Sequence, residues 1–459
     1  MTGFLRREAA DLPTLGAASD YLYRLPRGSK SVGLSRAAAL FRRLGSPQDA
    51  LRTVHVAGTA GKGSVCAFVS SILMAHGFRV GTHVSPHVRS ILERVQIDGV
   101  PLPPMEFVAT VRGLVPAVDA VARTSLSTPT FFEAANAVAF STFAARSLDY
   151  AVIETGIGGL LDATNTITRP DKLAVITRIG IDHTRLLGET VAEIATHKAG
   201  ILPTDGHGVV LRHPQASVRD TIAATAHVRR CSLDLLDPQH VSCAVGPDGT
   251  VLHTDAGDFR LGLQGRHQGV NAALALRAAR YLAARDAWTL DQSAVRTGLA
   301  RAWLPGRFER HVVNDRDVIL DGAHNNVKLM ALVDTVRALY PGRRATWVLA
   351  GKADKDLQSV LAAVTPVAAH IVATQIPEDG PGPIAPSLPA ACLAERARAR
   401  GLRAIAVADP VAAIATAMDL GDGPIVVTGS FLHLAAVDVP LAGAADRPAP
   451  RRVLTSPTA

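Results

Sequence analysis

The chain carries Thr53-Val54-His55-Val56-Ala57-Gly58-Thr59-Ala60-Gly61-Lys62-Gly63-Ser64, and an apolar run from Val65 to Met74 follows it. A β-branched run, a glycine-rich turn and a pattern that closes on Gly77 predict a strand, a loop and a helix. Glycines let backbone N–H groups point inward, and the helix start adds a partial positive charge to the full charge of Lys62. The stretch therefore predicts a binding site for a nucleoside triphosphate.

The spacing of this loop departs from the general Walker A pattern, which places four residues between its glycines and a Ser or Thr directly after its lysine. Here two residues separate Gly58 from Gly61, and Gly63 stands between Lys62 and Ser64. An ordinary glycine turn between a strand and a helix has the same local pattern. The loop alone leaves both interpretations open.

The composition indicates a globular protein of more than one domain. The chain has 459 residues, of which 48% are hydrophobic and 19% charged, which is ordinary for packed domains. Its net charge of +8 is spread along the chain and aromatic residues make up only 4%, so we expect no nucleic-acid-binding face. The excess charge suits a solvated surface or attraction of a polyanionic substrate.

Localisation follows from two further features. The four cysteines are scattered without a CxxC pair, which argues against a disulfide framework or a zinc site and for reduced thiols. The segment from Met1 to Pro13 lacks a continuous apolar stretch, so no signal peptide is expected, and the longest uncharged stretch is interrupted by Pro366. We expect a cytoplasmic monomer without membrane contact.

Strand-like and helix-like runs alternate along most of the chain, which predicts parallel sheets covered by helices. Residues 31–45 predict an amphipathic helix, and residues 230–263 a small antiparallel insertion. The predicted class is α/β, with a P-loop-containing parallel-sheet ATPase domain followed by a Rossmann-like α/β C-terminal domain. The predicted boundaries are 1–304 and 305–440, with a disordered tail over 441–459. Strands are expected at 151–154, 174–177, 208–211, 347–350, 371–374, 404–407 and 425–428, and helices at 130–145, 191–199 and 271–284.

Charged residues follow two of the predicted strands. Glu154 ends an apolar strand and glycines follow it, while Asp182 and His183 follow the next strand, before a helix that carries Lys198. Ligands bind at the carboxyl edge of a parallel sheet, and a carboxylate near phosphates is a natural magnesium ligand. Glu154 could instead simply cap a turn, and His183 could be a structural histidine.

The order of motifs resembles the folylpolyglutamate synthase and dihydrofolate synthase branch of the Mur ligase superfamily, over roughly residues 20 to 435. After the phosphate loop the matching motifs are Ser85-Pro86-His87, Thr130-Phe131-Phe132-Glu133, Ile153-Glu154-Thr155-Gly156-Ile157-Gly158-Gly159, Asp182-His183, Lys198-Ala199-Gly200, His267-Gln268-x-x-Asn271, Pro305-Gly306-Arg307, Asp321-Gly322-Ala323-His324-Asn325 and Thr428-Gly429-Ser430.

This resemblance implies that the protein binds ATP and Mg²⁺. The residues implied to hold ATP are Gly58, Thr59, Gly61, Lys62, Gly63, Ser64, Asn271 at the adenine, Arg307 on phosphate and Asp321 at the sugar. The metal ligands implied are Ser85, Glu154, His183 and Lys198, the last after carbamylation. The catalytic residues implied are Lys62, Glu154, His183, Lys198, Arg307 and His324.

The resemblance also implies where the other substrates bind. The pterin side of the acyl substrate would be lined by Thr130, Phe131, Phe132, Glu133, Leu161, Asp162 and Ala163. Lys355 and Ser430 would hold glutamate. The implied reaction forms an acyl phosphate from a folate-type acid, dihydropteroate or a reduced folate, and ATP, and the amino group of glutamate then displaces phosphate.

Three positions depart from the family pattern: Ala60 replaces a usual Asn, Leu160 a usual Arg, and His197 a usual Glu. Loss of a cation at Leu160, beside the expected pterin pocket, leaves open a Mur-type ligase that acts on a non-folate acid. A P-loop ATPase or kinase that makes no amide is a further alternative. Release of ADP that depends on an amino acid would distinguish a ligase from an ATPase.

Overall fold

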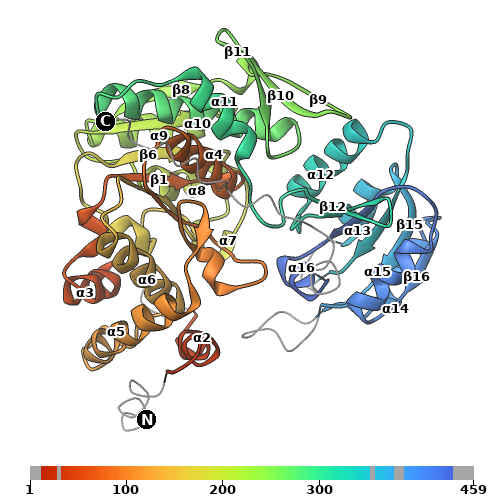
Figure 1. Cartoon of the computed structure of the whole chain (residues 1–459), viewed down its shortest axis with the longest axis horizontal. Helices are drawn as coiled ribbons and strands as arrows, with labels where there is room; N and C mark the ends of the chain where they lie inside the picture. The colour runs from red at the N-terminus through yellow and green to blue at the C-terminus, as the bar shows by residue number, and fades with distance from the viewer. Residues whose placement is uncertain (1–11, 28–32, 352–356, 377–386, 438–459) are drawn as a thin grey trace, which may run out of the picture. The chain divides into compact units, whose positions relative to one another are not determined.

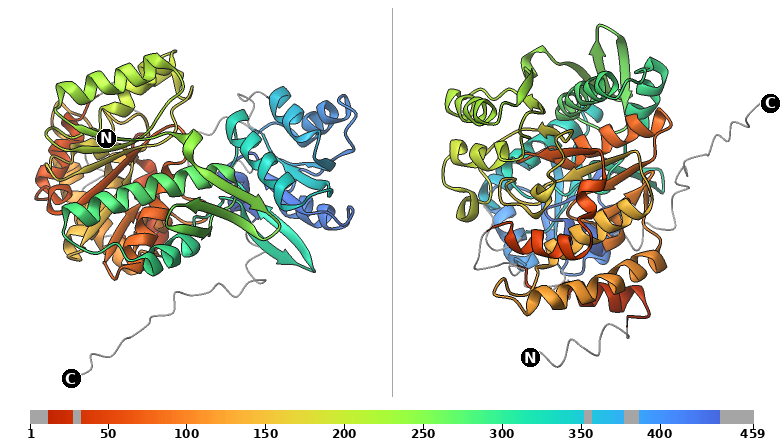
Figure 2. Two further views of the ribbon diagram at one scale, coloured as in Figure 1. Left: turned by 90° about the horizontal axis from the view of Figure 1, so that it is seen from above. Right: turned by 90° about the vertical axis from the view of Figure 1, so that its left-hand side faces the viewer.

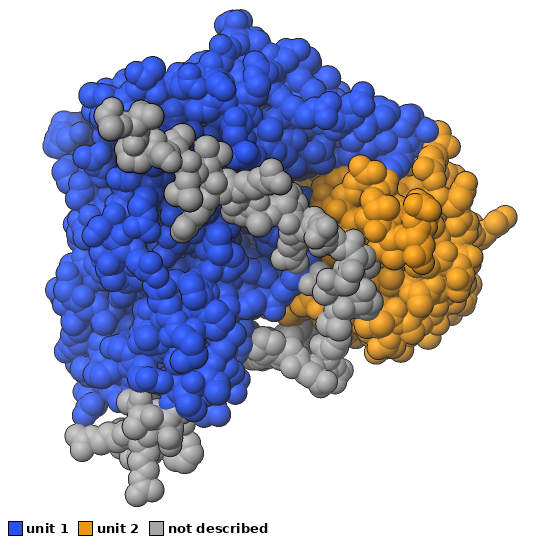
Figure 3. All heavy atoms as spheres, in the orientation of Figure 1, with its two compact units in different colours: residues 1–307, 334–341, 381–383 blue, residues 308–333, 342–380, 384–459 orange. Residues whose placement is uncertain are grey.

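The computed structural model describes residues 12–27, 33–351, 357–376 and 387–437, and the chain divides into two compact units (Figure 3). Unit 1 comprises residues 1–307, 334–341 and 381–383, and unit 2 comprises residues 308–333, 342–380 and 384–459. The tail predicted over 441–459 lies outside the described residues. Each unit is built on its own sheet, as the α/β class predicts.

Unit 1 contains an eight-stranded sheet whose central strand, β1, leads into the phosphate loop (Figure 1). Six of its strands are parallel and the other two, β3 and β4, run antiparallel at one edge. In spatial order the strands are β4 (Val100–Pro101), β3 (Val95–Ile97), β2 (Val80–His83), β5 (Tyr150–Glu154), β1 (Thr53–Ala57), β6 (Leu173–Ile176), β7 (His207–Leu211) and β8 (Ser232–Leu236).

Helices cover both faces of this sheet (Figure 2). Val54 and Val56 of β1 pack with one layer of helices, whereas Ala57 faces the other layer, as the two-residue period of a strand requires. The first layer comprises α4 (Lys62–Ala75), α10 (Arg266–Arg285) and α11 (Gln292–Arg301). The second comprises α2 (Leu15–Arg24), α3 (Ser35–Arg43), α5 (Pro104–Ala122), α6 (Phe131–Ala145), α8 (Val191–Ala199) and α9 (Ala216–Val228).

Short helices and a small second sheet complete unit 1. The short helices are η1 (Pro47–Ala50), η2 (Ile91–Arg94), η3 (Ala163–Thr166), α7 (Thr184–Leu187) and η4 (Pro238–His240). The second sheet is antiparallel and comprises β9 (Ser242–Gly246), β10 (Gly249–Thr254) and β11 (Gly257–Leu261). The antiparallel insertion is thus confirmed for residues 242–261, whereas β8, also inside the predicted range, joins the parallel sheet.

Unit 2 contains a six-stranded sheet that is parallel except for β12. In spatial order the strands are β12 (Glu309–Val313), β13 (Arg316–Leu320), β17 (Ile425–Thr428), β14 (Ala345–Leu349), β15 (Ala368–Ala373) and β16 (Ala404–Ala406). The helices that follow β13 along the chain are α12 (Asn326–Leu339), α13 (Leu357–Val364), α14 (Ala390–Arg398), α15 (Pro410–Met418) and α16 (Phe431–Val437). Among the described residues, no helix is both long and apolar enough to span a bilayer.

Each antiparallel edge contains a two-residue hairpin that was not predicted from the sequence. Asp98 and Gly99 join β3 to β4 with φ values of 52° and 76°, and Asn314 and Asp315 join β12 to β13 with values of 48° and 58°. Positive φ at both central residues matches the right-handed twist of paired strands, and Asp-Gly is a strong signal for such a turn. The sheets are therefore mixed only at their margins.

Candidate active site

The phosphate loop has a backbone conformation that depends on two glycines. Gly58 and Gly61 have φ values of 154° and 91°, in a region that residues with a Cβ rarely adopt. A Cβ on Gly58 would collide with the hydroxyl of Thr177, and one on Gly61 would lie 2.5 Å from Oδ1 of Asn271. Helix α4 begins at Lys62, so the loop presents a helix N-terminus and a lysine together.

Hydrogen bonds tie this loop to the segment after β6. Thr59 N donates to Arg178 O at 2.8 Å, and the Thr59 hydroxyl exchanges bonds with the backbone of Gly180 at 3.0 and 3.1 Å. Thr177 Oγ1 donates to Ala60 O at 2.8 Å. The predicted ATP-binding residue Thr59 thus holds the loop in shape through its side chain.

Asn271 and Ser64 are linked through Gln268. Gln268 Nε2 donates to Ser64 Oγ at 3.2 Å, and Asn271 Nδ2 donates to Gln268 Oε1 at 2.9 Å. Asn271 is buried against Gly61. Its amide therefore supports the phosphate loop, and contact with an adenine base stays a prediction.

Glu154 lies at the carboxyl end of β5 beside the start of α4. Its Oε1 is 3.8 Å from Lys62 Nζ, and its Oε2 accepts a hydrogen bond from Ser85 N at 2.9 Å. Burial raises the pKa of this carboxyl, while Lys62 and the Ser85 amide oppose the rise. The structure thus brings together a buried acid, a lysine and Ser85, three residues predicted to hold metal and phosphate.

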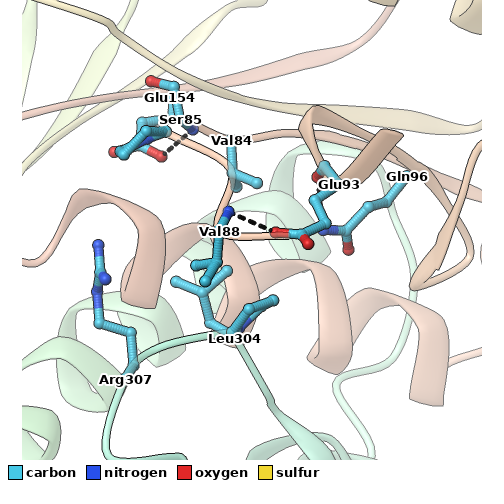
Figure 4. A pocket seen from close by; sticks show the side chains of 10 residues that line it. Val84, Ser85, Val88, Glu93, Gln96, Glu154, Leu304 and Arg307 are labelled. Atoms are coloured by element: carbon cyan, nitrogen blue, oxygen red, sulfur yellow. Dashed lines mark hydrogen bonds between the residues drawn. The ribbon is translucent and has the colours of Figure 1, made fainter. Parts of the chain in front are cut away.

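A small recess opens beside this acid (Figure 4). Ser85, Glu154, Leu304 and Arg307 line it, and all four belong to unit 1. An acid and an arginine face one small volume, so the recess suits a ligand that carries both a metal ion and phosphate groups.

Glu93 also lines this recess and was not singled out from the sequence. Its carboxylate accepts hydrogen bonds from the backbone N–H groups of Val88, Arg89 and Ser90 at 2.8 to 3.0 Å. Ser90 and Glu93 form a capping box at η2. The pattern Ser-x-x-Glu is a readable sign of such a box, so this residue could have been found.

Lys198 lies near the end of α8 and is 3% exposed. Burial and the nearby charge of Lys62 lower its pKa to about 7, although Asp162, Asp182 and Glu154 act in the opposite direction. A lysine with a lowered pKa carries a neutral, nucleophilic amine for part of the time. This environment is compatible with the predicted carbamylation.

His183 has a different environment from the other predicted metal ligands. It precedes the short helix α7 with a φ of 50°, and its side chain is 48% exposed. Among the described residues, no three His, Cys, Asp or Glu side chains gather closely enough to hold a metal. Glu154 and Ser85 supply the hard oxygen donors that Mg²⁺ prefers, and participation of His183 stays a prediction.

Asp162 was predicted to face the substrate, but its oxygens are used inside the protein. Oδ1 accepts from Thr164 N at 3.0 Å and from Thr164 Oγ1 at 2.6 Å, and Oδ2 accepts from Ile157 N at 2.9 Å. Its neighbour Ala163 is also buried, whereas Leu161 is 41% exposed. Of the three, Leu161 presents its side chain to solvent.

Thr130 and Glu133 likewise have partners within the protein. They form a capping box at the start of α6, and Arg36 Nε donates to Glu133 Oε2 at 2.7 Å. Phe132 packs on Gly156, where a Cβ would collide with its ring. The capping box orients α6 so that Phe131 and Phe132 lie beside the glycine loop and the N-terminal helix.

An aromatic and basic cluster next to Phe131 was missed by the sequence reasoning. Tyr23 stacks on Phe131 with ring centroids 5.5 Å apart, and the guanidinium of Arg94 lies 5.1 Å from the same ring. Arg94 Nε donates to His87 Nδ1 at 2.8 Å, so Nε2 of His87 carries the proton and donates to the Tyr23 hydroxyl at 3.2 Å. Burial and Arg94 lower the pKa of His87 to about 3. Arg27 adds a second guanidinium 5.9 Å from Phe131.

Leu160, predicted to lie beside the pterin pocket, packs against the end of the helix that carries Lys198. Its side chain rests against Gly200, at the end of α8, and its N–H donates to His197 O at 2.7 Å. Asn165 Nδ2 donates to both Leu160 O and Gly200 O, at 3.1 and 3.0 Å. Position 160 therefore contacts the helix that carries Lys198.

In unit 2, the predicted residues gather at the carboxyl ends of β13 and β17. Asp321 Oδ2 accepts from Phe308 N at 2.8 Å and Oδ1 from Ala323 N at 2.9 Å. His324 Nδ1 is 2.8 Å from Gly322 O, and Ser430 Oγ accepts from Leu432 N at 3.2 Å. Lys355 lies outside the described residues.

Comparison with known proteins gives consistent matches over most of the chain. A family model described as "Mur ligase, glutamate ligase domain" matches residues 306–431. The chain is similar to a dihydrofolate synthase/folylpolyglutamate synthase of Bacillus subtilis, with 36% identity over 74% of this chain and 79% of that protein. It is also similar to a folylpolyglutamate synthase of Lacticaseibacillus casei, with 32% identity over 92% of this chain and 97% of that protein.

A solved structure with a similar fold is folylpolyglutamate synthase of Mycobacterium tuberculosis complexed with ADP and AMPPCP. It superposes with a TM-score of 0.82 at 33% identity, over 94% of this chain and 99% of that one. The similarity therefore extends over residues of both units and is not confined to the phosphate loop.

Proposed function

The chain belongs to the folylpolyglutamate synthase/dihydrofolate synthase family of Mur ligases, and from this premise we propose that it joins L-glutamate to a folate-type acid at the expense of ATP. The acid is dihydropteroate, a tetrahydrofolate, or both. Residues 1–304 supply the ATP-binding domain and residues 305–440 the glutamate ligase domain. The enzyme works as a monomer in the cytoplasm.

One observation carries the proposal: the phosphate loop and a buried acid meet at the carboxyl edge of one sheet. Lys62 Nζ lies 3.8 Å from Glu154 Oε1, and Ser85 N donates to the other oxygen. A buried carboxylate kept close to a cation, without a direct salt-bridge hydrogen bond between them, is suited to exchange that contact for a metal ion and phosphate.

The substrate carboxylate attacks the γ-phosphorus of ATP, the bond from that phosphorus to the β-γ bridging oxygen breaks, and ADP leaves. The neutral amine of glutamate then attacks the carbonyl carbon of the resulting acyl phosphate. Inorganic phosphate leaves with the C–O electron pair and takes up the proton that the nitrogen loses. Lys62, the N-terminus of α4 and Arg307 stabilise the negative charge that the transferring phosphoryl group carries. Burial around Glu154 excludes water that would hydrolyse the acyl phosphate.

Mg²⁺, when bound, screens the phosphate charge and orients the phosphoryl group for transfer. Glu154 and Ser85 are the residues proposed to hold it, with His183 and a carbamylated Lys198 as further ligands. Gly58, Thr59, Gly61, Gly63 and Ser64 shape the loop that holds the phosphates, Asn271 lies at the adenine, and Asp321 binds the sugar.

The acyl substrate is proposed to lie along the aromatic cluster that begins at Phe131. Phe131, Phe132 and the exposed Leu161 offer apolar surface, and the guanidinium groups of Arg27 and Arg94 lie over the Phe131 ring. A planar, electron-rich heterocycle with an attached carboxylate suits such a surface.

Glutamate is proposed to bind in unit 2. Ser430 and His324 lie at the strand ends of that unit, where open α/β sheets bind ligands, and Lys355 is the proposed partner of the side-chain carboxylate. The match of residues 306–431 to a glutamate ligase domain supports this assignment.

The test is an assay of the purified chain with ATP, Mg²⁺ and either dihydropteroate or tetrahydrofolate, with and without L-glutamate. We expect ADP release only when both the acid and glutamate are present, and a product heavier by one glutamyl residue in the mass spectrum. ADP release that is independent of glutamate would indicate an ATPase or kinase. Sedimentation of the same sample tests the monomer.

A further inference from the structure

A buried histidine stands in the strand that leads into the phosphate loop. His55 is the middle residue of β1 and is fully buried. Along β1, Val54 and Val56 pack with the layer of α4 and α10, so the alternate residue His55 points to the opposite face of the sheet. On that face its Nε2 lies 2.8 Å from Thr164 Oγ1, in η3.

The contact continues as a chain of hydrogen bonds with a defined direction. Thr164 Oγ1 is 2.6 Å from Asp162 Oδ1, and Asp162 also accepts from the backbone N–H groups of Thr164 and Ile157. Burial raises the pKa of the Asp162 carboxyl, while these hydrogen bonds oppose the rise and favour the ionised form. The Thr164 hydroxyl must therefore donate to Asp162, and it can only accept from His55, whose Nε2 carries the proton.

This chain of bonds ends at the loop that follows Glu154. Ile157, which donates to Asp162, lies three residues after Glu154, and the same loop donates from Leu160 N to His197 O, one residue before Lys198. The two sets of bonds connect β1 with the glycine loop and with α8. Strand β1 leads through the phosphate loop to Lys62, the glycine loop follows Glu154, and α8 carries Lys198.

A merely tolerated core histidine is the alternative explanation, and one feature argues against it. Nδ1 of His55 is buried and has no hydrogen-bond partner within the described part of the chain. An unsatisfied buried nitrogen costs free energy that an apolar side chain of similar size would avoid. The hydrogen bond from Nε2 is therefore the contact that distinguishes His55 from an apolar core residue.

We propose that His55 is a positioning residue that, through Thr164 and Asp162, holds the glycine loop after Glu154 in register with the phosphate loop. His55 touches no substrate in this account, which rests on the proposed function of the site. Its neutral side chain acts only as a hydrogen-bond donor, and the position of Glu154 relative to Lys62 depends on that bond.

The kinetic test compares substitutions that remove one donor or acceptor with substitutions that retain it. His55→Met and Thr164→Val should each lower kcat for glutamate-dependent ADP release about 10-fold, a moderate loss for a displaced catalytic group, with KM for ATP changed less than about 2-fold. The Mg²⁺ concentration for half-maximal rate should rise. His55→Gln and Thr164→Ser, which retain the N–H and the hydroxyl, should recover most of the rate.

The double variant His55→Met/Thr164→Val should be no slower than the slower single variant, because both remove one shared bond. A matched control is His207→Met, since His207 Nδ1 also pairs with a hydroxyl, Ser232 Oγ at 2.7 Å, but at the start of β7. The control should keep the wild-type kcat. Additive losses at His55 and Thr164, or wild-type rates in folded His55→Met, would overturn the proposal.

A measurement without substrate separates this inference from the proposed function. In ¹⁵N-labelled protein, His55 should show a protonated Nε2 and a bare Nδ1. It should stay neutral below the pH at which histidines usually take up a proton, because burial and Lys172 hold its pKa well below the usual range. Thr164→Val should shift the Nε2–H resonance strongly. A proton on Nδ1 would contradict the direction of the chain of bonds, whatever the enzyme's substrate proves to be.

Discussion

The two ends of the unit 1 sheet treat buried polar groups differently. At the amino end, where β5 starts, the Tyr150 hydroxyl donates to Asp286 Oδ2 at 2.6 Å and accepts from Trp288 Nε1 at 3.1 Å. Arg285 holds both oxygens of Asp286 at 2.8 and 2.7 Å, and Phe78 packs edge-on against Tyr150 and Trp288. The charges of Arg285 and Asp286 at this end neutralise one another.

At the carboxyl end, where β5 finishes, charges are brought close without full pairing. Lys62 and Glu154 are 3.8 Å apart, which exceeds a hydrogen bond. Burial raises the pKa of Glu154 and lowers that of Lys198 to about 7. At the amino end, where the polar groups only stabilise the fold, each buried charge has a full partner. At the carboxyl end the partners are incomplete, which leaves charges for a bound ligand to neutralise.

Lys62→Ala gives the sharpest test of this contrast. It should lower kcat at least about 100-fold, since one electrostatic contact to a reacting group is typically worth that much, while the melting temperature stays near that of the wild type. Turnover and thermal unfolding of the same preparation check it. Near-normal turnover in a folded variant would show that Lys62 is not part of the active site. It would also contradict the difference inferred between the two ends of the sheet.

Lys198→Ala should also lower kcat about 100-fold, because the proposed carbamate supplies an anionic ligand that alanine cannot supply. Formate or acetate in the assay should restore part of the rate by filling the vacated position. Lys62→Ala with the same acids is the control and should not recover. A crystal structure of the active enzyme in which unmodified Lys198 contacts phosphate would contradict its role as a carbamylated metal ligand. Electron density for a carboxylate on Nζ would support that role.

Glu154→Gln should reduce activity about 10-fold at ordinary Mg²⁺, since the amide keeps the shape but loses the charge that a hard cation prefers. Raising Mg²⁺ should recover part of the rate, with KM for ATP less affected. The measurement is the rate as a function of Mg²⁺ for variant and wild type. An unchanged Mg²⁺ dependence would mean that Glu154 only caps its loop.

Tyr150→Phe should leave kcat unchanged and lower the free energy of unfolding by about 1 kcal/mol, because Asp286 and Trp288 each lose a hydrogen-bond partner. Burial and the bond to Asp286 raise the pKa of Tyr150 to about 12. A raised folded-state pKa stabilises the protein below the unfolded-state value of about 10 and loses that effect as pH rises toward 12. The difference in free energy of unfolding between the wild type and Tyr150→Phe should therefore shrink between about pH 10 and pH 12. Chemical denaturation at several pH values measures it.

Much of the fold could be predicted because it depends on local signals. Residues 31–45 predicted a helix, and α3 occupies Ser35–Arg43 with Gly45 at a φ of 81° beyond its end. The strand ending at Glu154 was predicted from one short apolar run and is β5. The edge hairpins were overlooked although Asp98 and Gly99 are a readable turn.

The partners of individual side chains could not be predicted in the same way. Glu133 was assigned to the substrate because its motif matches a family position, yet Arg36, 97 residues earlier, pairs with it. Tyr23, His87, Arg94 and Phe131 come from separate segments, and nothing local marks them as one cluster. Leu160 turns toward Gly200 because its N–H is held by His197, a contact that depends on how α8 packs.

By itself the sequence determined the α/β class, the phosphate loop and the kinds of group that end its strands, because periodicity, glycine positions and strand-end residues act over a few neighbours. Only the tertiary structure decided which of those groups meet. Strand β1 lies between β5 and β6, so His55 meets Thr164 across 109 residues of chain, and Lys62 meets Glu154 across a similar gap. Such meetings arise from the order of strands in the sheet, which buries long-range pairs together and is not encoded in any short stretch.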